Sequence, residues 1–328
     1  MMFKDKTILI TGGTGSWGNE LTTQLLTKNP KQIIIFSRSE LHQVNMQRKF
    51  NNSKLKFVIG DVRDHDRLVE ATKNVDYIFH LAALKHVPVC EEQPYEAIKT
   101  NIVGTKNIIE AAKINNVKKV IDVSTDKAVD PLNLYGMTKA IGEKLIIQAN
   151  LEPSNTVFVC IRGGNVLGTN GSVVPFFISQ IKEQGYISLT DKKMTRYFLT
   201  LQQAISLLFK ASEISHGGET FVMKMPGCKI SDLAEVLAEA VSDKLVPIKE
   251  IGTRPGEKID EVLISRYESP RTYQFDDDYF VILPELKIDD LESKYDKLQK
   301  VDFSEYSSKD SLMDKKQIKE MLINGKFI

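Results

Sequence analysis

Residues 124–139 (STDKAVDPLNLYGMTK) contain side chains whose types and spacing suit redox and acid–base chemistry. Tyr135 and Lys139 are four residues apart, so they lie on one face if the segment is helical. A lysine ammonium beside a phenol stabilises the phenolate and lowers the pKa of the tyrosine from its usual value of about 10. Such a tyrosine takes a proton from an alcohol while hydride leaves for a nicotinamide. The pair predicts the redox centre of a dehydrogenase; a half-buried tyrosine on an amphipathic helix is the alternative without a catalytic role.

An acid and an amine, Asp126 and Lys127, stand just upstream and follow Thr125. To act as a general acid Asp126 has to carry a proton, and to act as a base Lys127 has to be neutral. Burial favours the uncharged form of each group. Alternatively, the two side chains form an ion pair at rest, and one proton transfer between them prepares both groups. A solvated Asp–Lys turn is the alternative without a function.

A glycine-rich turn, TGGTGSWG, follows the first apolar run directly. Glycines at such a turn let the backbone approach a pyrophosphate, and the start of the next helix offers free N–H groups to the anion. A plain strand-to-helix turn is the alternative without a ligand. The residues expected to contact a dinucleotide here are Gly12, Thr14, Gly15, Ser16, Trp17 and Gly18.

The end of the second apolar run (IIIFSRSE) bears on the choice of cofactor. NAD sites usually place an acidic residue there, whereas this chain has Ser37 and Arg38. An arginine binds a phosphate through two donors, so the run favours NADP. Glu40 reaching the ribose would favour NAD instead. Residues that follow the third and fourth runs are expected to hold the adenine edge and to let the cofactor approach: Asp61, Val62, Ala82 and Ala83.

The elements that must position these residues alternate along the first half of the chain. Six short apolar runs lie at 6–11, 32–37, 55–60, 77–82, 118–124 and 157–162, with helical spacing between them. Apolar strands separated by helices indicate an α/β fold with a doubly wound parallel sheet. We expect a Rossmann domain over 1–165 and a smaller, mostly helical substrate domain over 166–285, which exchanges segments with the first. Residues 286–328 read as a charged tail, either solvated or packed on a neighbouring subunit.

The bulk composition excludes several classes of partner. The 328 residues carry 44 Lys plus Arg against 43 Asp plus Glu, a net charge of +1, so nucleic acid and membrane surfaces are not expected partners. The three cysteines lie far apart, which fits a reducing compartment. With neither a signal peptide nor a spanning segment apparent, a cytoplasmic protein is expected. The histidines show no metal-ligand spacing, so we expect no metal site.

The order of TGGTGSWG, HLAA, STDK and Tyr-x-x-x-Lys resembles that of the extended short-chain dehydrogenase/reductase family. More narrowly, the chain is similar to UDP-N-acetylglucosamine 4,6-dehydratases of the configuration-inverting, pseudaminic-acid-pathway type. The narrower resemblance rests on longer motifs up to about residue 264: SRSEL, GDVRD, AALKHVP, TNIVGT, STDKAVDPLNLYGMTK, RGGNVLGTNGSVVPFF, MTRYFLT and IGTRPGEK.

The resemblance implies a lyase that oxidises C4 of UDP-N-acetylglucosamine, eliminates water across C5 and C6, and returns the hydride to C6. It implies Tyr135 and Lys139 for the redox steps, and Lys127 and Asp126 as base and acid of the elimination. Dehydratases of thymidine-nucleotide sugars carry Asp-Glu at this place, so Lys127 is a departure that points to the UDP-N-acetylhexosamine branch. Membrane-anchored members that retain C5 have Met in place of Tyr135, which favours inversion here.

The substrate side is expected to combine amide, cationic and apolar groups. An Asx turn is the alternative for Asn165, and a solvated surface is the alternative for Lys85. Arginines suit a diphosphate, and the apolar residues suit a uracil wall. The expected substrate-binding residues are Lys85, Asn165, Val173, Pro175, Phe176, Arg196, Arg254 and Glu257.

Three other functions remain open from the sequence. A nucleotide-sugar epimerase on the same fold works with Tyr and Lys alone and needs no acid and amine before the tyrosine. A C5-retaining dehydratase differs only in stereochemistry, and a non-catalytic NADP-binding module often lacks the Tyr-x-x-x-Lys pair. Relatives assemble as dimers or hexamers, so a homo-oligomer is expected by analogy.

Overall fold

The computed structural model describes residues 2–169, 172–253 and 256–328. All six predicted strands of the first half are present, and a helix follows each of the first five. The strands are β1 (Thr7–Thr11), β2 (Gln32–Ser37), β3 (Leu55–Ile59), β4 (Tyr77–His80), β5 (Lys119–Thr125) and β6 (Val157–Gly163). The helices between them are α1 (Ser16–Leu26), α2 (Glu40–Phe50), α3 (His65–Ala71), α4 (Val87–Glu92), α5 (Pro94–Ile98), π-helix η1 (Lys99–Val103), α6 (Gly104–Ile114), 3₁₀ turn η2 (Asp126–Ala128) and α7 (Leu134–Gln148).

Within the described residues, the main sheet has nine strands in the order β14-β15-β10-β6-β5-β4-β1-β2-β3. All pairs from β3 to β10 (Thr220–Met223) are parallel, whereas β15 (Tyr279–Ile282) runs antiparallel to both β10 and β14 (Thr272–Gln274). The strand order reverses between β1 and β4, where doubly wound folds bind dinucleotides. The predicted α/β doubly wound fold is confirmed.

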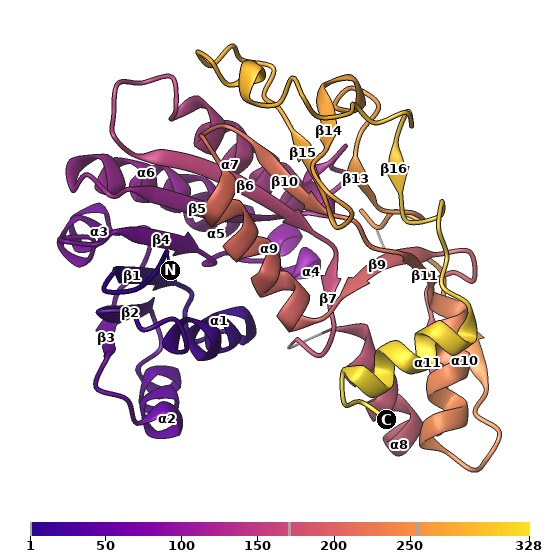
Figure 1. The fold of residues 1–328 in the computed structure, drawn as a ribbon. Coiled ribbons are helices and arrows are strands. Elements are labelled where there is room, and N and C mark those ends of the chain that lie inside the picture. The colour runs from indigo at the N-terminus through magenta and orange to yellow at the C-terminus, as the bar shows by residue number, and fades with distance from the viewer. Residues whose placement is uncertain (1, 170–171, 254–255) are drawn as a thin grey trace.

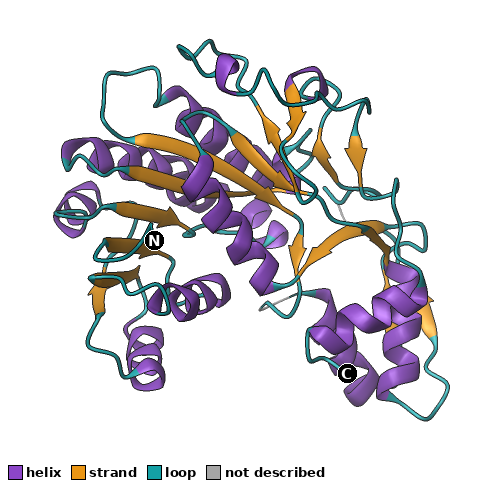
Figure 2. Cartoon of the chain, in the orientation of Figure 1, coloured by secondary structure: helices purple, strands orange, loops and turns teal. Residues whose placement is uncertain are grey.

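Helices cover both faces of this sheet (Figure 2). Along β1, Ile8 and Ile10 belong to the core under α1 and α9 (Leu201–Ile214), whereas Leu9 belongs to the core under α3, α6 and α7. Side chains of a strand alternate between faces, so a strand covered on both faces is apolar at most positions, whereas β3 at the edge of the sheet is partly exposed. This explains why the six runs lack the alternation of a half-exposed sheet.

The second half of the chain builds a smaller lobe and also returns to the main sheet. Helices α8 (Val173–Gln184), α10 (Ile230–Val241) and α11 (Lys315–Asn324) share one apolar core, which Ile318 and Leu322 of α11 enter. The last helix of the expected tail thus packs within the chain, where it lies beside α10 (Figure 1). Short strands complete this half: β7 (Asn165–Val166), β8 (Ile187–Leu189), β9 (Thr195–Leu199), β11 (Gly227–Lys229), β12 (Ile248–Glu250), β13 (Val262–Ile264) and β16 (Tyr306–Ser307), with 3₁₀ turns η3 (Ser269–Arg271) and η4 (Glu292–Lys294).

A buried ion-pair triad joins the returning chain to the first half. The Arg162 guanidinium on β6 binds the carboxylate of Glu143 on α7 at 2.6 Å and that of Glu268 at 2.8 Å. Burial raises the pKa of Glu268, but the charge and hydrogen bonds of Arg162 outweigh it and lower this pKa to about 2. One guanidinium therefore fixes the segment after β13 against the parallel sheet.

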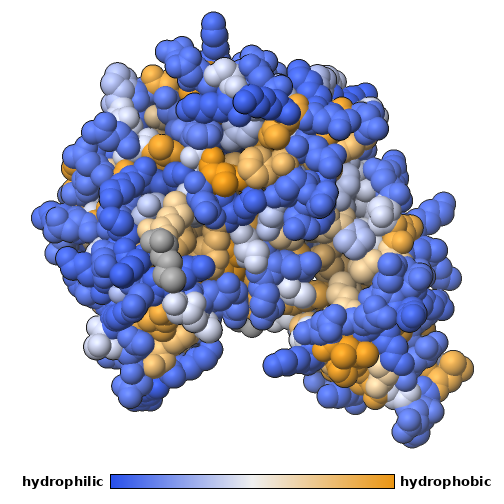
Figure 3. All heavy atoms as spheres, viewed as in Figure 1, coloured by the Kyte–Doolittle hydropathy of each residue, from blue (hydrophilic) through white to orange (hydrophobic). Residues whose placement is uncertain are grey.

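The surface in Figure 3 is mostly hydrophilic, and a hollow at its lower edge separates the lobe of α8, α10 and α11 from that of α1 and α2. In the part of the chain that the structure describes, no helix is both long and apolar enough to span a bilayer.

Candidate active site

The glycine-rich turn lies where the strand order reverses, between β1 and α1. Gly12 has φ +63°, and a Cβ there would lie 3.0 Å from the backbone N and Cα of Ala82. A Cβ on Gly18 would lie 2.2 Å from the carbonyl oxygen of Gly13, so α1 packs directly on the turn. A side chain at either position would separate the turn from its neighbours, which explains both glycines.

The start of α1 fits a pyrophosphate. Gly15 is the N-cap, and within the described residues no side chain caps the helix and no acidic residue occupies its first turn. Ser16 and Trp17 form the first turn, and the Thr14 carbonyl accepts a hydrogen bond from Asn19 at 3.0 Å. Exposed helical N–H groups with a partial positive charge suit an anion. These residues would hold the phosphates of a dinucleotide.

The ends of β2 and β3 lie side by side at the position expected for the adenosine. Ser37 accepts a hydrogen bond from Gln43 at 3.0 Å, and Arg38 is exposed. The Asp61 carboxylate binds Arg63 at 2.6 Å. Burial raises the pKa of Asp61, but Arg63 and the nearby charge of Arg38 outweigh it and lower this pKa. Asp61 is thus an ionised group already held by an arginine.

Small residues lie on the β4 side of the expected dinucleotide site. Ala82 and Ala83 follow β4 in a half-buried loop. Val62 is buried against Gly104, where a Cβ would approach the valine side chain to 2.7 Å. The structure therefore brings the cofactor-side residues predicted from sequence to one edge of the sheet.

Tyr135 and Lys139 both lie on α7, which begins where the Asn133 side chain accepts a hydrogen bond from the N–H of Gly136 at 2.8 Å. The expected fall in the pKa of Tyr135 is not seen. Burial raises this pKa, and the nearby charges of Lys139 and Lys127 offset only part of the effect. The ammonium of Lys139 is paired with Asp122 at 3.2 Å, which also weakens its field at the phenol.

Asp126 and Lys127 form an ion pair on the turn η2. The Asp126 carboxylate accepts hydrogen bonds from the Lys127 ammonium at 3.0 Å and from the Thr125 hydroxyl at 2.9 Å. Burial lowers the pKa of Lys127, but Asp126 and Glu261 outweigh it and the pKa is raised. Of the two arrangements considered from sequence, the structure shows the resting ion pair.

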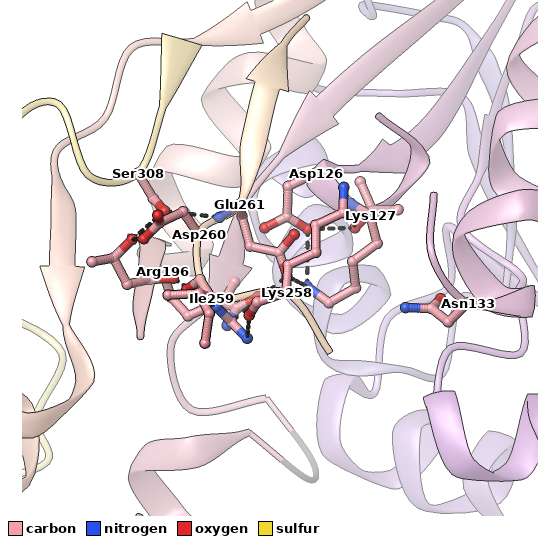
Figure 4. A network of polar contacts seen from close by, with 12 residues as sticks. Asp126, Lys127, Asn133, Arg196, Lys258, Ile259, Asp260, Glu261 and Ser308 are labelled. Carbon is pink, nitrogen blue, oxygen red and sulfur yellow. Dashed lines mark hydrogen bonds and ion pairs between the residues drawn. The ribbon is translucent and has the colours of Figure 1, made fainter. Parts of the chain in front are cut away.

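Glu261, which the sequence analysis did not single out, completes this cluster. Its carboxylate lies 3.3 Å from the Lys127 ammonium and 3.6 Å from the Arg196 guanidinium. Burial raises its pKa, with the charge of Lys127 acting in the opposite direction. Among the described residues, one oxygen of Glu261 and one of Asp126 are buried without a hydrogen-bond partner. Figure 4 shows Asp126 and Lys127 on one side of the cluster, with Arg196, Lys258 and Glu261 opposite.

Arg196 is held mainly by backbone. Its guanidinium donates to the carbonyl oxygens of Thr195 at 2.7 Å, Lys258 at 2.9 Å and Ile259 at 3.0 Å. The Lys258 ammonium in turn donates to the carbonyl of Val129 at 2.5 Å. Arg196 therefore fixes the segment that carries Glu261 and keeps little donor capacity for a diphosphate.

Two adjoining cavities open beside the cluster. The first, of about 190 Å³, is polar and is lined by Val87, Lys127, Asn133, Asn165, Arg196, Gly256, Glu257, Lys258 and Glu261. The second, of about 340 Å³, is lined by Asn165, Val173, Phe176, Phe177, Ser188, Thr190, Met194, Arg196, Ile230, Ile251 and Glu257. Asn165, Arg196 and Glu257 line both. The arrangement suits a ligand with a polar sugar at one end and a flat apolar group at the other.

Three predicted substrate residues are placed differently from the rest. Pro175 is exposed on α8, and Phe177 rather than Pro175 lines the larger cavity among the described residues. Lys85 is exposed in the loop after β4 and lines neither of the two cavities. Arg254 lies outside the described residues. No group of three or more potential metal ligands occurs in the described parts of the chain.

Comparison with known proteins relates this site to nucleotide-sugar chemistry. A family described as "Polysaccharide biosynthesis protein" matches residues 8–283. The inverting UDP-N-acetylglucosamine 4,6-dehydratase of Campylobacter jejuni (serotype O:23/36) is 46% identical over 90% of this chain and 87% of its own. A UDP-glucose 4-epimerase of Rickettsia bellii (strain OSU 85-389) is 48% identical over 81% of this chain and 80% of its own. The X-ray structure of Pen from Bacillus thuringiensis has a TM-score of 0.92 and 41% identity, covering 99% of this chain and 100% of that one.

The contact between η2 and α7 predicts the effect of two glycine substitutions. A Cβ on Gly136 would lie 2.1 Å from the carbonyl oxygen of Lys127, so Gly136→Ala has to push the Asp126–Lys127 turn away from Tyr135. We expect a loss of about 1–3 kcal/mol in the free energy of unfolding, measured in urea. Gly142→Ala is the control on the same helix, since its nearest neighbour is 3.6 Å away. It should gain up to about 1 kcal/mol through helix propensity. Equal effects of the two variants would contradict the close contact.

Proposed function

The chain belongs to the polysaccharide biosynthesis protein family, within the extended short-chain dehydrogenases/reductases, and from that membership we propose that it is an NADP-dependent UDP-N-acetylglucosamine 4,6-dehydratase. The observation that carries the proposal is the Asp126–Lys127 ion pair beside the start of α7, of which Lys127 lines the polar cavity. An enzyme that only oxidises and reduces has no use for it. The similarity to the Campylobacter jejuni dehydratase supports the same activity.

The proposed reaction begins and ends with the same protein charges. A nicotinamide cofactor held at the turn of Gly12, Gly15 and Gly18 would supply the hydride acceptor for C4 and the hydride donor for C6. Tyr135 releases its own proton to solvent and then, as the phenolate, takes the proton of the C4 hydroxyl. A proton passes from Lys127 to Asp126 along their 3.0 Å hydrogen bond, which leaves an amine and a carboxylic acid. The amine removes the C5 proton while the acid protonates the C6 hydroxyl, which leaves as water, and the ion pair is restored.

The remaining proton completes the balance. C5 receives one proton from solvent when C6 receives hydride, which balances the proton that Tyr135 released to solvent at the start. The net change is the loss of one water, with no added reductant. We propose inversion at C5, as in the name of the Campylobacter jejuni relative.

The substrate residues divide between the two cavities. Asn165 and Glu257 line both, so we assign them to the sugar and diphosphate region, whereas Arg196 positions the segment that carries Glu261. Val173 and Phe176 border the larger cavity and suit the uracil. Lys85, Pro175 and Arg254 remain assignments from sequence. Glu261 stabilises the Lys127 ammonium that forms when the C5 proton is removed.

The epimerase alternative is favoured by the Rickettsia bellii relative, which is as similar to this chain as the dehydratase. An epimerase also oxidises C4, but it removes no proton from C5 and expels no hydroxyl. Asp126 and Lys127 would then have no chemical step to perform. The two functions therefore predict different products from one substrate.

The activity is tested by incubating the protein with NADP⁺ and UDP-N-acetylglucosamine in deuterated water. Mass spectrometry should show loss of one water with gain of one deuterium. The C5 signal should disappear from the proton spectrum, and product made in ordinary water should show an inverted C5. Lys127→Ala should abolish water loss and retain C4 oxidation, whereas Lys144→Ala, an exposed lysine on α7, should leave both unchanged. A C4 epimer without water loss would favour the epimerase, and NADPH-dependent reduction of a keto sugar would favour a reductase.

The cofactor proposal rests on Arg38, which lies near Asp61 at the end of β2. A hydrogen-bonded ion pair with a 2′-phosphate contributes about 1.5–3 kcal/mol, so Arg38→Ala should weaken NADP⁺ binding by about 10–100-fold and NAD⁺ binding little. Isothermal titration of both cofactors measures this, with the exposed Arg48→Ala on α2 as control. Tighter binding of NAD⁺ than NADP⁺ by the unmodified protein would reverse the assignment.

A homo-oligomer, dimer or hexamer, is the proposed assembly. Exposed apolar side chains occur on α5, η1 and α7, which pack on one another: Tyr95, Val103, Met137 and Ile141. Ile141→Asp should reduce the mass measured by sedimentation velocity, because an ionised group disfavours a buried interface. Leu245→Asp, in the other lobe and 95% exposed, should leave it unchanged. A monomeric unmodified protein would contradict the proposal.

The cytoplasm is the proposed location. Cys90, Cys160 and Cys228 are all buried free thiols, which agrees with a reducing compartment.

A further inference from the structure

We propose that Asp122, in the middle of β5, is a positioning residue for the redox pair, because it keeps the ammonium of Lys139 charged and fixed below Tyr135. The inference deepens the proposed function, since it concerns the same redox step. It starts from a carboxylate that the reaction does not use and that no solvent reaches: the exposed fraction of Asp122 is 0%.

The contact between the two residues is direct. The Lys139 ammonium lies 3.2 Å from one oxygen of Asp122 and 3.5 Å from the other. Lys139 is itself only 3% exposed. An ammonium buried this deeply loses its charge unless a counter-charge stands beside it. Asp122 supplies that charge from the strand directly beneath the helix.

The other groups facing this pair across the sheet are neutral. Thr11, His80, Asp122 and Cys160 stand in register on β1, β4, β5 and β6. Burial lowers the pKa of His80 to about 4, and its ring nitrogens contact the hydroxyls of Thr11 and Thr105. Burial also raises the pKa of the Cys160 thiol well above its usual value.

Charges on the neighbouring elements do not replace Asp122. From α7, Tyr135 faces Lys139 as a neutral phenol whose pKa is raised, and Glu143 is bound by Arg162. Arg162 itself also binds Glu268. Lys127 and Asp126 form the separate pair on η2. Burial lowers the pKa of Lys139, and Asp122 reverses the effect and raises it.

The consequence for the redox step concerns the alkaline side of its pH dependence. Tyr135 needs a nearby cation to release its proton, and Lys139 can serve only while it is protonated. With Asp122 present, Lys139 stays charged beyond the pH range of the reaction. With Asp122→Asn, burial acts alone and Lys139 loses its proton at lower pH. We expect the alkaline limb of C4 oxidation to move down by on the order of one pH unit or more.

The deciding experiment needs neither substrate nor cofactor. In the unmodified protein, the raised pKa of Lys139 gives a stability contribution that is constant between pH 7 and 9 and is lost only as pH rises from the unfolded pKa through the folded pKa. In Asp122→Asn, the folded pKa lies below the unfolded value, so the unfolded state binds more protons and stability rises with pH. The difference in free energy of unfolding between the two proteins, measured in urea, should therefore shrink from pH 7 to pH 10.

Three further variants make the result specific. The double variant Asp122→Asn/Lys139→Met should lose the pH dependence, because no group is left to titrate. Val120→Ala, a buried residue on the same strand whose side chain does not titrate, should destabilise by the same amount at every pH. If Asp122→Asn does not fold, Lys139→Met alone gives the reciprocal result: burial favours the protonated form of the stranded Asp122, so stability falls as pH rises from 4 to 7.

The proposal would be overturned if the difference in free energy of unfolding between Asp122→Asn and the unmodified protein did not change with pH. The same holds for Lys139→Met if Asp122→Asn does not fold. A shrinking difference together with an unmoved alkaline limb would also overturn it, because Lys139 would then titrate without affecting Tyr135. Failure of the proposed function alone has a different signature: the unfolding experiment gives the expected slope, but the protein turns over no nucleotide sugar.

Discussion

The site depends on one ammonium, that of the half-buried Lys127, which lies between the carboxylates of Asp126 and Glu261. Each of these groups would be costly to bury alone, and the three are tolerable only together. Asp126 and Lys127 follow β5 of the parallel sheet, whereas Glu261 precedes β13 in the second half. The bonds of Arg196 and Lys258 to backbone carbonyls, and that of Asn133 to Gly256 at 2.9 Å, hold the second segment in place. The polar cavity therefore exists only when the two halves of the chain are joined.

The parts of this arrangement that sequence predicts are the local ones. Six mainly apolar runs give six strands because most of their positions are buried, and Tyr135 and Lys139 share a helix because their spacing matches one turn. Glu261 was missed because it lies in a charged segment, GEKIDE, which reads as solvated surface. Its pairing with Lys127 crosses more than a hundred residues and has no local signal. Asp122 did have a local sequence signal: an acidic residue in the middle of a mainly apolar run has to find a partner. Phe177 replaces Pro175 at the larger cavity because the exact phase of a helix is not fixed by its sequence.

Two lysines stand near Tyr135, and each is held by a carboxylate of its own. This separates their tasks. Lys127 lines the polar cavity and shares a hydrogen bond with Asp126, so its proton can move. Lys139 is bound to an acid beneath the helix, away from the reacting groups, so its proton stays. The net effect of burial and these two charges leaves the pKa of Tyr135 raised in the protein alone. One site thus contains a mobile proton on Lys127 and a fixed charge on Lys139, which lie on the consecutive elements η2 and α7.

The order of strands in the main sheet has a consequence for the chain during its synthesis. Strand β6 ends at Gly163, but its outer neighbour β10 begins only at Thr220, and the outermost strands β15 and β14 come later still. While the ribosome is between these points, β6 is an open edge that carries the apolar run VFVCI. Exposed edges of this kind pair with other chains. A nascent protein that stalls before Thr220 is therefore a target for chaperones or for aggregation, whereas release after Ile282 closes the edge with an antiparallel pair.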